Sequence, residues 1–504
     1  MRVVSIIPSF GTGGLTGAVL NRSILLSATE NDVCIFTYEF AINYRDVVDD
    51  LKSQGKLKDD IVVVNPYDYF FEKYNADNAD NADNADNADN IADLRPKAYR
   101  IESKTLSGNF IRIGYDIEGD KVWRSFTKSG NKREFRLEIL DRVGRIVQVD
   151  HFDSSGFRRQ SDVVSNDIIV STKMFSINGF CFLRTEFSEK GRIVGVQAFS
   201  PTSEKVKVFK SIWDWRRQFF KEFVAAAGDV LILCDGNNVP GQFLRLKSTR
   251  HKIVAVIHMN HLDDKGKLKK QYEAYFERLS EFDAVIALTS EQAADLRKFS
   301  GGTANIVVIG NPLPVASILD TQRTRDAVIV SRLVGGKGLD EAILAAKLVV
   351  ESYPGFKLDI FGTGPLESTL KSLISELDLL GNVRLLGQTK TPLQEFASSK
   401  ISLFTSRSEG FGLTIAESLM MGTPVISLPC SYGPSELIQT GYTGNLLPNR
   451  DMRPFADAIL ELIHNPAKQR EFGANGVKWI EANFGSETIH SKWIDIIRRI
   501  RADA

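Results

Sequence analysis

Residues 3–14 read VVSIIPSFGTGG, and this stretch decides the fold class of the chain. It is an apolar run that ends at Pro8 and is followed by a glycine loop. Apolar residues then recur at helical spacing, at Leu15, Val19 and Leu20. A strand, a glycine loop and a helix in this order begin a doubly wound α/β domain. We therefore predict that the next apolar runs, 33–37 and 61–64, are further strands of the same domain.

A triplet repeat interrupts this pattern. Residues 75–90 read NADNADNADNADNADN. Asn and Asp side chains compete with the backbone for hydrogen bonds, and the repeat has nothing to bury in a core. An acidic metal-binding tract is one interpretation, but the composition favours a solvated linker at a domain boundary.

From about residue 107 to residue 201 apolar and polar residues alternate, with glycine-containing turns between short runs. This spacing predicts an antiparallel β-meander with strands at 110–115, 135–140, 146–152, 168–171, 181–187 and 193–199. Because the meander interrupts the α/β pattern, we interpret 76–212 as an inserted domain.

The α/β pattern resumes near Trp213. It predicts buried strands at 230–234, 253–257, 285–288 and 306–309, and a second series at 327–330, 357–361, 383–386, 401–404 and 424–427. The chain thus divides into one Rossmann-like lobe (1–75 and 213–312) and a second (313–485), with a cleft between them. Residues 486–504 form an amphipathic helix that carries Trp493, Ile496 and Ile497.

The composition is that of an ordinary globular protein, with 43% hydrophobic and 25% charged residues. Lys+Arg and Asp+Glu both number 63, so no overall charge attracts nucleic acid. The four cysteines are too far apart for a zinc or disulfide framework, which fits a reducing compartment: Cys34, Cys181, Cys234 and Cys430. The first ten residues are too short an apolar run for a signal peptide, and we expect a cytoplasmic protein.

The first candidate binding segment is 330–338, VSRLVGGKG, directly after a predicted strand. Ligands of open α/β sheets bind at the carboxyl ends of the strands. Arg332 can fork onto two phosphate oxygens, and Lys337 supplies a compact charge. Such a pair of charges is ordinarily interpreted as two solvated residues of a loop. This segment alone is therefore weak evidence for a phosphate site.

The second candidate segment is 408–417, SEGFGLTIAE, which follows a strand and opens a helix. Its glycines let backbone N–H groups approach a ligand, and a helix N-terminus favours anionic oxygens. Glu409 and Glu417 can accept hydrogen bonds from hydroxyls at opposite ends of a sugar nucleotide. A capped, solvated helix start is the alternative, which the glycines disfavour.

Together, Arg-x4-Lys and Glu-x7-Glu, with IFGTGP at 360–365 between them, resemble the retaining family-4 glycosyltransferases of the GT-B fold. The resemblance covers the C-terminal lobe. It implies that Arg332 and Lys337 hold the diphosphate, Glu409 contacts the donor sugar and Glu417 binds the ribose. It also implies donor contacts along the glycine segment and beside the nucleobase, from Gly410, Phe411, Gly412, Leu413, Thr414, Gly387, Gln388 and Thr389.

In the first lobe, Gly13 and Gly14 can place backbone donors against the phosphates, although a tight turn explains two glycines equally well. A polar cluster, 258–261, ends the strand 253–257. The resemblance makes His258 the residue that meets the transferred sugar, whereas a lone histidine there is more often structural. We interpret His261 as a loop residue.

The segments 233–236, 256–261 and 432–435, with the β-insertion, are similar to a Gram-positive branch of that family. Its members glycosylate the polyol-phosphate polymers of wall teichoic acid, and relatives glycosylate serine-rich adhesins. The resemblance implies a UDP-sugar-dependent hexosyltransferase that transfers glucose or N-acetylglucosamine without a metal ion or other cofactor. It also implies an anionic polymer or protein acceptor and a location in the cytoplasm, with association at the inner face of the cell membrane as a further expectation.

Three alternatives share this fold. A protein O-glycosyltransferase would keep every donor residue, whereas a non-catalytic partner subunit would be expected to have lost Arg332, Lys337 or Glu409. A glycogen-synthase-like or phosphorylase enzyme has the same fold, but the β-insertion favours a polymer-binding accessory role over it. A metal-dependent enzyme of the other glycosyltransferase fold needs an Asp-x-Asp, and we see none.

The sequence shows no nucleophile for a double displacement, so same-face attack, in which a donor phosphate oxygen takes the acceptor proton, is the favoured mechanism. The insertion carries basic residues that look exposed: Lys128, Lys132, Arg133, Arg158 and Arg159. They favour either an acceptor platform for a polyanion or a merely solvated face, and the sheet edges can alternatively pair with another subunit.

Overall fold

The computed structural model describes residues 1–11, 13–30, 32–76, 94–98, 100–106, 109–128, 133–236, 239–263, 265–313 and 321–502. They form two compact units. Unit 1 comprises Met1–Ser5, Thr12–Val33 and Asp229–Ala504, and unit 2 comprises Ile6–Gly11 and Cys34–Gly228. Most of the NAD repeat and Lys132 lie outside the described residues.

A seven-stranded sheet has the order β17-β16-β15-β14-β1-β2-β3. Its strands are β1 (Arg2–Ile7), β2 (Val33–Thr37), β3 (Val62–Val64), β14 (Val230–Asp235), β15 (His251–Ile257), β16 (Ala284–Ala287) and β17 (Ile306–Val308). Strands β14 to β17 run parallel, and almost every residue in β1, β14 and β15 is buried. Helix α1 (Gly14–Ser27) follows the glycine loop, as the opening sequence predicts. The remaining helices among these strands are α6 (Val239–Phe243), α7 (Lys270–Phe276) and α8 (Ser290–Phe299).

A six-stranded parallel sheet in unit 1 has the order β20-β19-β18-β21-β22-β23. Its strands are β18 (Arg325–Val330), β19 (Leu358–Phe361), β20 (Val383–Leu385), β21 (Ser399–Phe404), β22 (Val425–Ser427) and β23 (Gly444–Leu446). The strand order reverses beside β18, as it does in Rossmann-type sheets. Sequence patterning missed β23, because three residues beginning with glycine give no apolar run.

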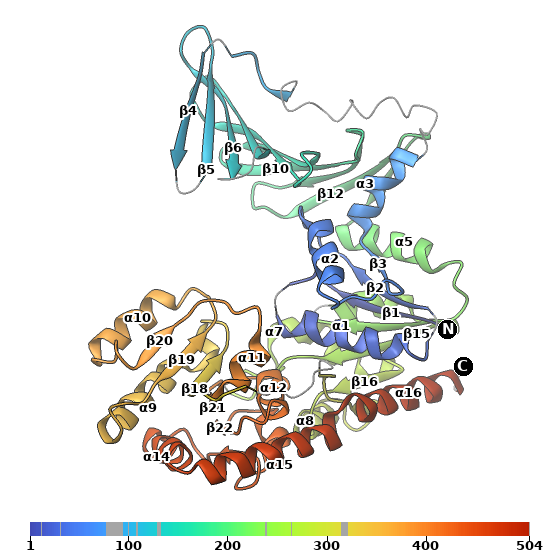
Figure 1. The fold of residues 1–504 in the computed structure, drawn as a ribbon. Coiled ribbons are helices and arrows are strands. Elements are labelled where there is room, and N and C mark those ends of the chain that lie inside the picture. The colour runs from blue at the N-terminus through green and yellow to red at the C-terminus, as the bar shows by residue number, and fades with distance from the viewer. Residues whose placement is uncertain are drawn as a thin grey trace. The chain divides into compact units, whose positions relative to one another are not determined.

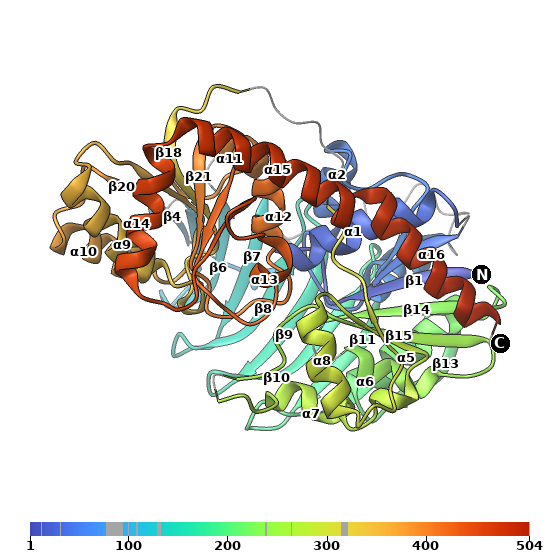
Figure 2. The same cartoon turned by 90° about the horizontal axis from the view of Figure 1, so that it is seen from below.

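Helices of this second lobe pack on its sheet and continue to the C-terminus. They are α9 (Leu339–Ser352), α10 (Glu367–Glu376), α11 (Pro392–Ala397), α12 (Leu413–Met420), α13 (Pro434–Leu437), α14 (Met452–Ile463), α15 (Pro466–Phe484) and α16 (Ser486–Ala502). Figure 2 shows α15 and α16 following one another along unit 1. Trp493 and Ile497 of α16 are buried in one hydrophobic cluster with Val3, Leu26 and Leu231. The C-terminal helix therefore belongs to the core around β1 and β14.

Unit 2 contains a ten-stranded antiparallel sheet in which each strand pairs with its neighbours in sequence (Figure 1). The strands are β4 (Arg100–Leu106), β5 (Asn109–Tyr115), β6 (Lys121–Lys128), β7 (Glu134–Leu140), β8 (Ile146–Phe152), β9 (Arg158–Ser165), β10 (Ile168–Phe175), β11 (Cys181–Phe187), β12 (Ile193–Ser200) and β13 (Ser203–Phe209). The predicted meander and the predicted fold class are confirmed. Sequence patterning missed β4, β6, β9 and β13, because their alternate residues are mostly charged or hydroxylated.

Three hairpin turns of this sheet share one design. Asp116, Asp141 and Asp153 each accept hydrogen bonds from the backbone N–H groups two and four residues further on. Three residues after each of them a glycine has φ between 81° and 92°. Only glycine adopts that conformation without strain, so the Asp-x-x-Gly spacing fixes where each hairpin turns.

Helices α2 (Tyr44–Ser53), α3 (Pro66–Ala76) and α5 (Ile212–Val224) complete unit 2. Tyr67 and Tyr74 of α3 and Trp215 of α5 share a buried cluster with Leu183 and Val196 of the sheet. Aromatic rings therefore provide the core of this unit.

Two of the basic residues that the sequence suggests are exposed are not. Arg159 is 2% exposed, donates a hydrogen bond to Asp68 of α3 at 2.8 Å and stacks over Phe71 at 4.0 Å. Arg158 is half-buried, with its guanidinium 3.9 Å from the Phe175 ring centre. Lys128 and Arg133 are exposed. The expectation was wrong for Arg158 and Arg159, because aromatic and acidic partners far away in sequence enclose them.

We predict that Arg159→Met destabilises the protein by about 3–5 kcal/mol, because it leaves the Asp68 carboxylate without its buried partner. The matched control Lys128→Met should change stability by less than about 0.5 kcal/mol, since that side chain is exposed. Calorimetric unfolding of the full chain measures both. Equal transitions for the two variants would contradict the role assigned to Arg159.

Candidate active site

Two loops leave neighbouring strands at the carboxyl edge of the six-stranded sheet. The loop 331–338 follows β18, and the loop 405–412 follows β21, which pairs with β18. Thr405 Oγ1 donates a hydrogen bond to the Lys337 carbonyl at 3.0 Å, and the Arg407 N–H donates one to the Gly336 carbonyl at 2.9 Å. The two predicted binding segments therefore form one structure.

The predicted charged residues meet where these loops touch. Lys337 Nζ lies 2.5 Å from Glu409 Oε1, and the two side chains are 20% and 16% exposed. Arg332 is exposed, and no described residue forms an ion pair with it. The loop 331–338 thus carries two cations, of which Lys337 faces a carboxylate, so this loop can receive an anionic ligand.

Arg450 holds the two loops together. Its guanidinium donates to the carbonyls of Thr405, Ser406 and Pro429 at 2.6, 3.1 and 2.8 Å, and to the Glu341 carboxylate at 3.0 and 2.5 Å. Glu341 lies in the first turn of α9, directly after the Lys337 loop. Sequence analysis missed Arg450, because it lies 113 residues beyond Lys337 and resembles any surface arginine.

Glycines allow close backbone approaches at this site. A Cβ on Gly410 would stand 1.9 Å from the His258 carbonyl oxygen, so the β15 end and the Glu409 loop touch through backbone atoms. Gly412 has φ of 87° immediately before α12. A Cβ on Gly14 would be 3.1 Å from the Leu413 side chain, which places the start of α1 beside the start of α12. Two helix N-termini thus lie close together, an arrangement that favours an anion.

His258 is held by a buried acid. Its Nε2 lies 2.6 Å from Asp235 Oδ1 at the end of β14, and Arg22 of α1 donates to both Asp235 oxygens at 2.9 and 2.5 Å. Burial raises the pKa of Asp235, but the Arg22 charge and hydrogen bonds from His258 and Arg22 outweigh it, and the net pKa is lowered. Sequence analysis gave Arg22 no role, because it looks like an ordinary helical residue.

Glu417 lies on α12 and is half-buried. Burial raises the pKa of its carboxyl to about 7. No described residue donates a hydrogen bond to this carboxylate. A half-buried acid without a partner at a ligand-facing sheet edge is a candidate for ligand contact.

The remaining predicted residues lie in two places. The Gly387 carbonyl accepts a hydrogen bond from the Gly362 N–H at 2.7 Å, so 387–389 follow β20 at the same carboxyl edge, and Gln388 is exposed there. Phe411, by contrast, is 2% exposed, with its ring 5.6 Å from that of Phe484. Only the backbone of Phe411 is therefore available to a ligand.

His261 lies in the loop between β15 and α7, as predicted, but its burial was not foreseen. It is fully buried, its ring stacks on Tyr432 at 5.6 Å, and neither ring nitrogen has a hydrogen-bond partner among the described residues. Burial lowers the pKa of His261 to about 4. No feature of the sequence indicates this burial, because Tyr432, which covers the ring, is 171 residues away.

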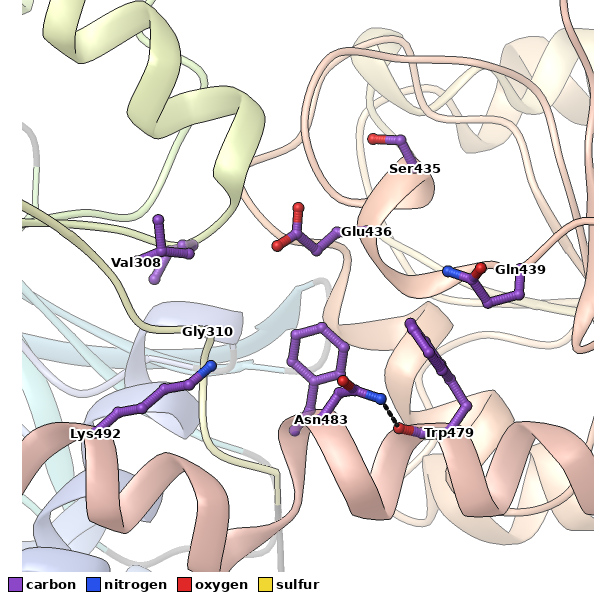
Figure 3. Close-up of a pocket in the computed structure, with 10 residues that line it drawn as sticks. Val308, Gly310, Ser435, Glu436, Gln439, Trp479, Asn483 and Lys492 are labelled. Carbon is purple, nitrogen blue, oxygen red and sulfur yellow. Dashed lines mark hydrogen bonds between the residues drawn. The ribbon is translucent and has the colours of Figure 1, made fainter.

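A cavity of about 310 Å³ lies elsewhere in unit 1 (Figure 3). Its walls include Val308, Gly310, Glu436, Trp479 and Lys492. It contains none of the predicted site residues.

In the described part of the chain, the three carboxylates close enough to share a metal ion are those of Asp116, Glu118 and Asp120, in the β5–β6 turn. The described helices include none long and apolar enough to cross a membrane.

Residues 318–479 match the family model described as "Glycosyl transferases group 1". Most of the second lobe thus resembles a group 1 glycosyltransferase domain. This match covers both binding loops, the Glu417 helix and Arg450. The resemblance predicted from Arg332, Lys337, Glu409 and Glu417 is thereby confirmed.

Relatives align along the whole chain. The poly(ribitol-phosphate) alpha-N-acetylglucosaminyltransferase of Staphylococcus aureus is 27% identical over 493 residues, covering 96% of each chain. The poly(glycerol-phosphate) alpha-glucosyltransferase of Bacillus subtilis is 27% identical, covering 93% of this chain and 70% of its own. The structure of S. aureus TarM with UDP, fondaparinux and alpha-GlcNAc-glycerol superposes with a TM-score of 0.83 at 23% identity, covering 98% and 99%. The predicted GT-B architecture and the predicted class, a hexosyltransferase, are confirmed.

We predict that Arg450→Lys loosens both site loops, because a lysine cannot reproduce the five hydrogen bonds of the guanidinium. Hydrogen–deuterium exchange should rise in peptides covering 332–338 and 405–410, while the core of β18 stays protected. Arg453→Lys, at an exposed position nearby, is the control. Unchanged exchange in Arg450→Lys would show that the loops hold together without it.

Glu417 should make stability depend on pH. Its pKa is about 7 in the folded protein, above the usual 4.5, so the neutral form favours folding. The stabilisation is present below pH 4.5 and is lost as pH rises to about 7. Wild type should therefore fall in melting temperature relative to Glu417→Gln between pH 5 and pH 8. The exposed control Glu376→Gln should show no such divergence, and parallel curves for Glu417→Gln and wild type would refute the assignment.

Proposed function

We propose that this protein transfers glucose or N-acetylglucosamine from a UDP-sugar to a polyol-phosphate polymer of wall teichoic acid, with retention of anomeric configuration. The observation that carries the proposal is that the Lys337–Glu409 pair, two helix N-termini and the His258 backbone lie together in unit 1. Arg332 is exposed in the same loop as Lys337. Similarity to polyol-phosphate glycosyltransferases over 96% of the chain supports the acceptor class.

The donor would lie along the carboxyl edge of the six-stranded sheet. Arg332 and Lys337 neutralise the diphosphate, and the N–H groups at Gly14 and at Gly412–Thr414 add hydrogen bonds. Glu417 accepts from the ribose hydroxyls, while 387–389 border the base. When the donor enters, Lys337 exchanges part of its contact with Glu409 for phosphate, which frees Glu409 to contact the sugar.

Catalysis consists of stabilising charge as the glycosidic bond breaks. The bond to the anomeric carbon opens toward the diphosphate, and the electron pair passes to the phosphate oxygen beside Arg332 and Lys337. The acceptor hydroxyl attacks from the same face, and its proton passes to a donor phosphate oxygen. Fixed cations supply the positive charge, so we propose that no metal ion takes part.

We propose that residues 76–212 serve as the inserted domain and present an edge to partners. The edge strand β13 is exposed, including Val206 and Val208. A second copy of this chain can pair there. We favour homo-oligomerisation over an acceptor platform, because Arg159 is buried and Arg158 is half-buried. Because UDP-sugars are cytoplasmic metabolites, we propose that the enzyme is cytoplasmic. Association with the inner face of the membrane stays a prediction. A protein acceptor also stays a prediction.

A transfer assay tests the proposal. With poly(ribitol-phosphate) or poly(glycerol-phosphate) as acceptor, UDP-glucose or UDP-N-acetylglucosamine should be consumed and the polymer glycosylated, also in EDTA. Arg332→Ala and Lys337→Ala should each lower the rate about 10²-fold or more, since each removes charge from the leaving group. Lys347→Ala, on α9, is the control. Transfer only to a serine-rich peptide, or loss of activity on chelation, would overturn the acceptor class or the metal-free mechanism, respectively.

A further inference from the structure

The end of β14 carries a side chain that organises three elements. Asp235 is fully buried, and its Oδ1 contacts both Arg22 Nη1 at 2.9 Å and His258 Nε2 at 2.6 Å. Arg22, which is 2% exposed, also donates to Ser5 Oγ at 2.9 Å. Helix α1 and strands β1, β14 and β15 thus share one polar centre inside unit 1.

The charge state of Asp235 determines which nitrogen of His258 carries a proton. The Arg22 charge helps to hold the pKa of Asp235 below its usual value, so the carboxyl is an anion that can only accept hydrogen bonds. The hydrogen in its short contact with His258 must therefore belong to Nε2. In a neutral imidazole, Nδ1 is then an acceptor.

Nδ1 is the ring nitrogen left for a ligand. Among the described residues none forms a hydrogen bond with it, and the side chain is 7% exposed. The His258 carbonyl lies against Gly410, the residue after Glu409. The free acceptor of His258 thus belongs to a strand end that touches the sugar-facing loop.

The C-terminal helix supports this centre from behind. The Arg22 guanidinium lies 5.1 Å from the ring centre of Trp493 on α16. Trp493 is 2% exposed and shares a core with Val3 and Leu231. A cation held over a ring face is attracted to it, and the ring also excludes water from the ion pair.

We propose that Asp235, Arg22 and Trp493 are positioning residues that hold His258 as the Nε2–H tautomer, so that Nδ1 accepts a hydrogen bond from a hydroxyl of the transferred sugar. The hydrogen bond from the sugar to His258 rests on the proposed function, whereas the assignment of the tautomer does not. A purely structural ion pair that fastens α1 to the sheet is the alternative, and it predicts no effect on His258.

The tautomer can be measured without any activity. The full chain labelled with ¹⁵N-histidine contains six histidines, and His258→Gln assigns the signal. Two-bond ¹H–¹⁵N spectra at pH 8 should show a protonated Nε2 and a bare Nδ1 for His258. A protonated Nδ1, or equal populations of the two tautomers, overturns the inference whatever the transferase assay shows.

Kinetics test the positioning role. The double variant Arg22→Met with Asp235→Leu removes both charges together, so neither is left buried alone. We expect kcat to fall about 10²-fold while UDP binding, measured by calorimetry, stays within twofold, because the diphosphate groups lie elsewhere. Asp326→Asn, which breaks a buried pair with Lys400 at the opposite end of β18, is the control and should leave kcat unchanged. A folded double variant with wild-type kcat refutes the proposal.

Substitutions at Trp493 distinguish the contact of its ring with Arg22 from simple packing. Trp493→Leu keeps the site apolar but removes the ring, and should lower kcat about threefold or more and broaden the His258 tautomer signal. Trp493→Phe keeps a ring under Arg22 and should restore both. If Leu and Phe behave alike, α16 contributes packing alone and Trp493 leaves the proposed set; if wild type shows the tautomer but no transfer, the proposed function fails and the tautomer assignment survives.

Discussion

The backbone contact between Gly410 and His258 is the constraint on which the site depends. There is no room for a Cβ between the Glu409 loop and the His258 carbonyl. Through this contact the carboxyl ends of β15 and β21, which belong to different sheets, meet in unit 1. His258 and Glu409 lie at this contact and Lys337 pairs with Glu409, so a larger side chain at position 410 would separate the two halves of the candidate site.

The arginines of the candidate site differ in burial, and their partners differ accordingly. Arg22 and Asp235 are sealed from solvent and neutralise each other, and Arg450 is tied to Glu341 and three carbonyls. Arg332 remains exposed. Buried pairs fix geometry, because breaking one leaves a costly lone charge, whereas an exposed cation is free to bind an incoming anion. The same residue type, arginine, therefore serves as support at positions 22 and 450 and is exposed at position 332, where we propose a ligand contact.

The inserted sheet is stabilised differently from the two parallel sheets. Three of its hairpins are set locally by Asp-x-x-Gly turns, and its core toward α3 and α5 is built from aromatic rings. Arg159, enclosed between Asp68 and Phe71, fastens α3 to the sheet. Arg158 and Arg159 thus stabilise the insertion itself, and its exposed edge is the surface that we propose for a partner.

Sequence by itself determined the two Rossmann-like sheets and the meander, because each depends on local signals: apolar runs, glycine loops and alternating residues. The candidate donor residues Arg332, Lys337, Glu409 and Glu417 were proposed from motif spacing, since they lie in the loops and the helix that follow two strands. Tertiary structure alone decided which residues support them. Arg450 binds Glu341, more than a hundred residues before it and just after the Lys337 loop, Trp493 covers Arg22, and Tyr432 covers His261. No periodicity records such contacts, because folding, not spacing, brings these partners together. The burial of Arg158 and Arg159 was misjudged for the same reason: a charged residue looks exposed in sequence until its distant partner is known.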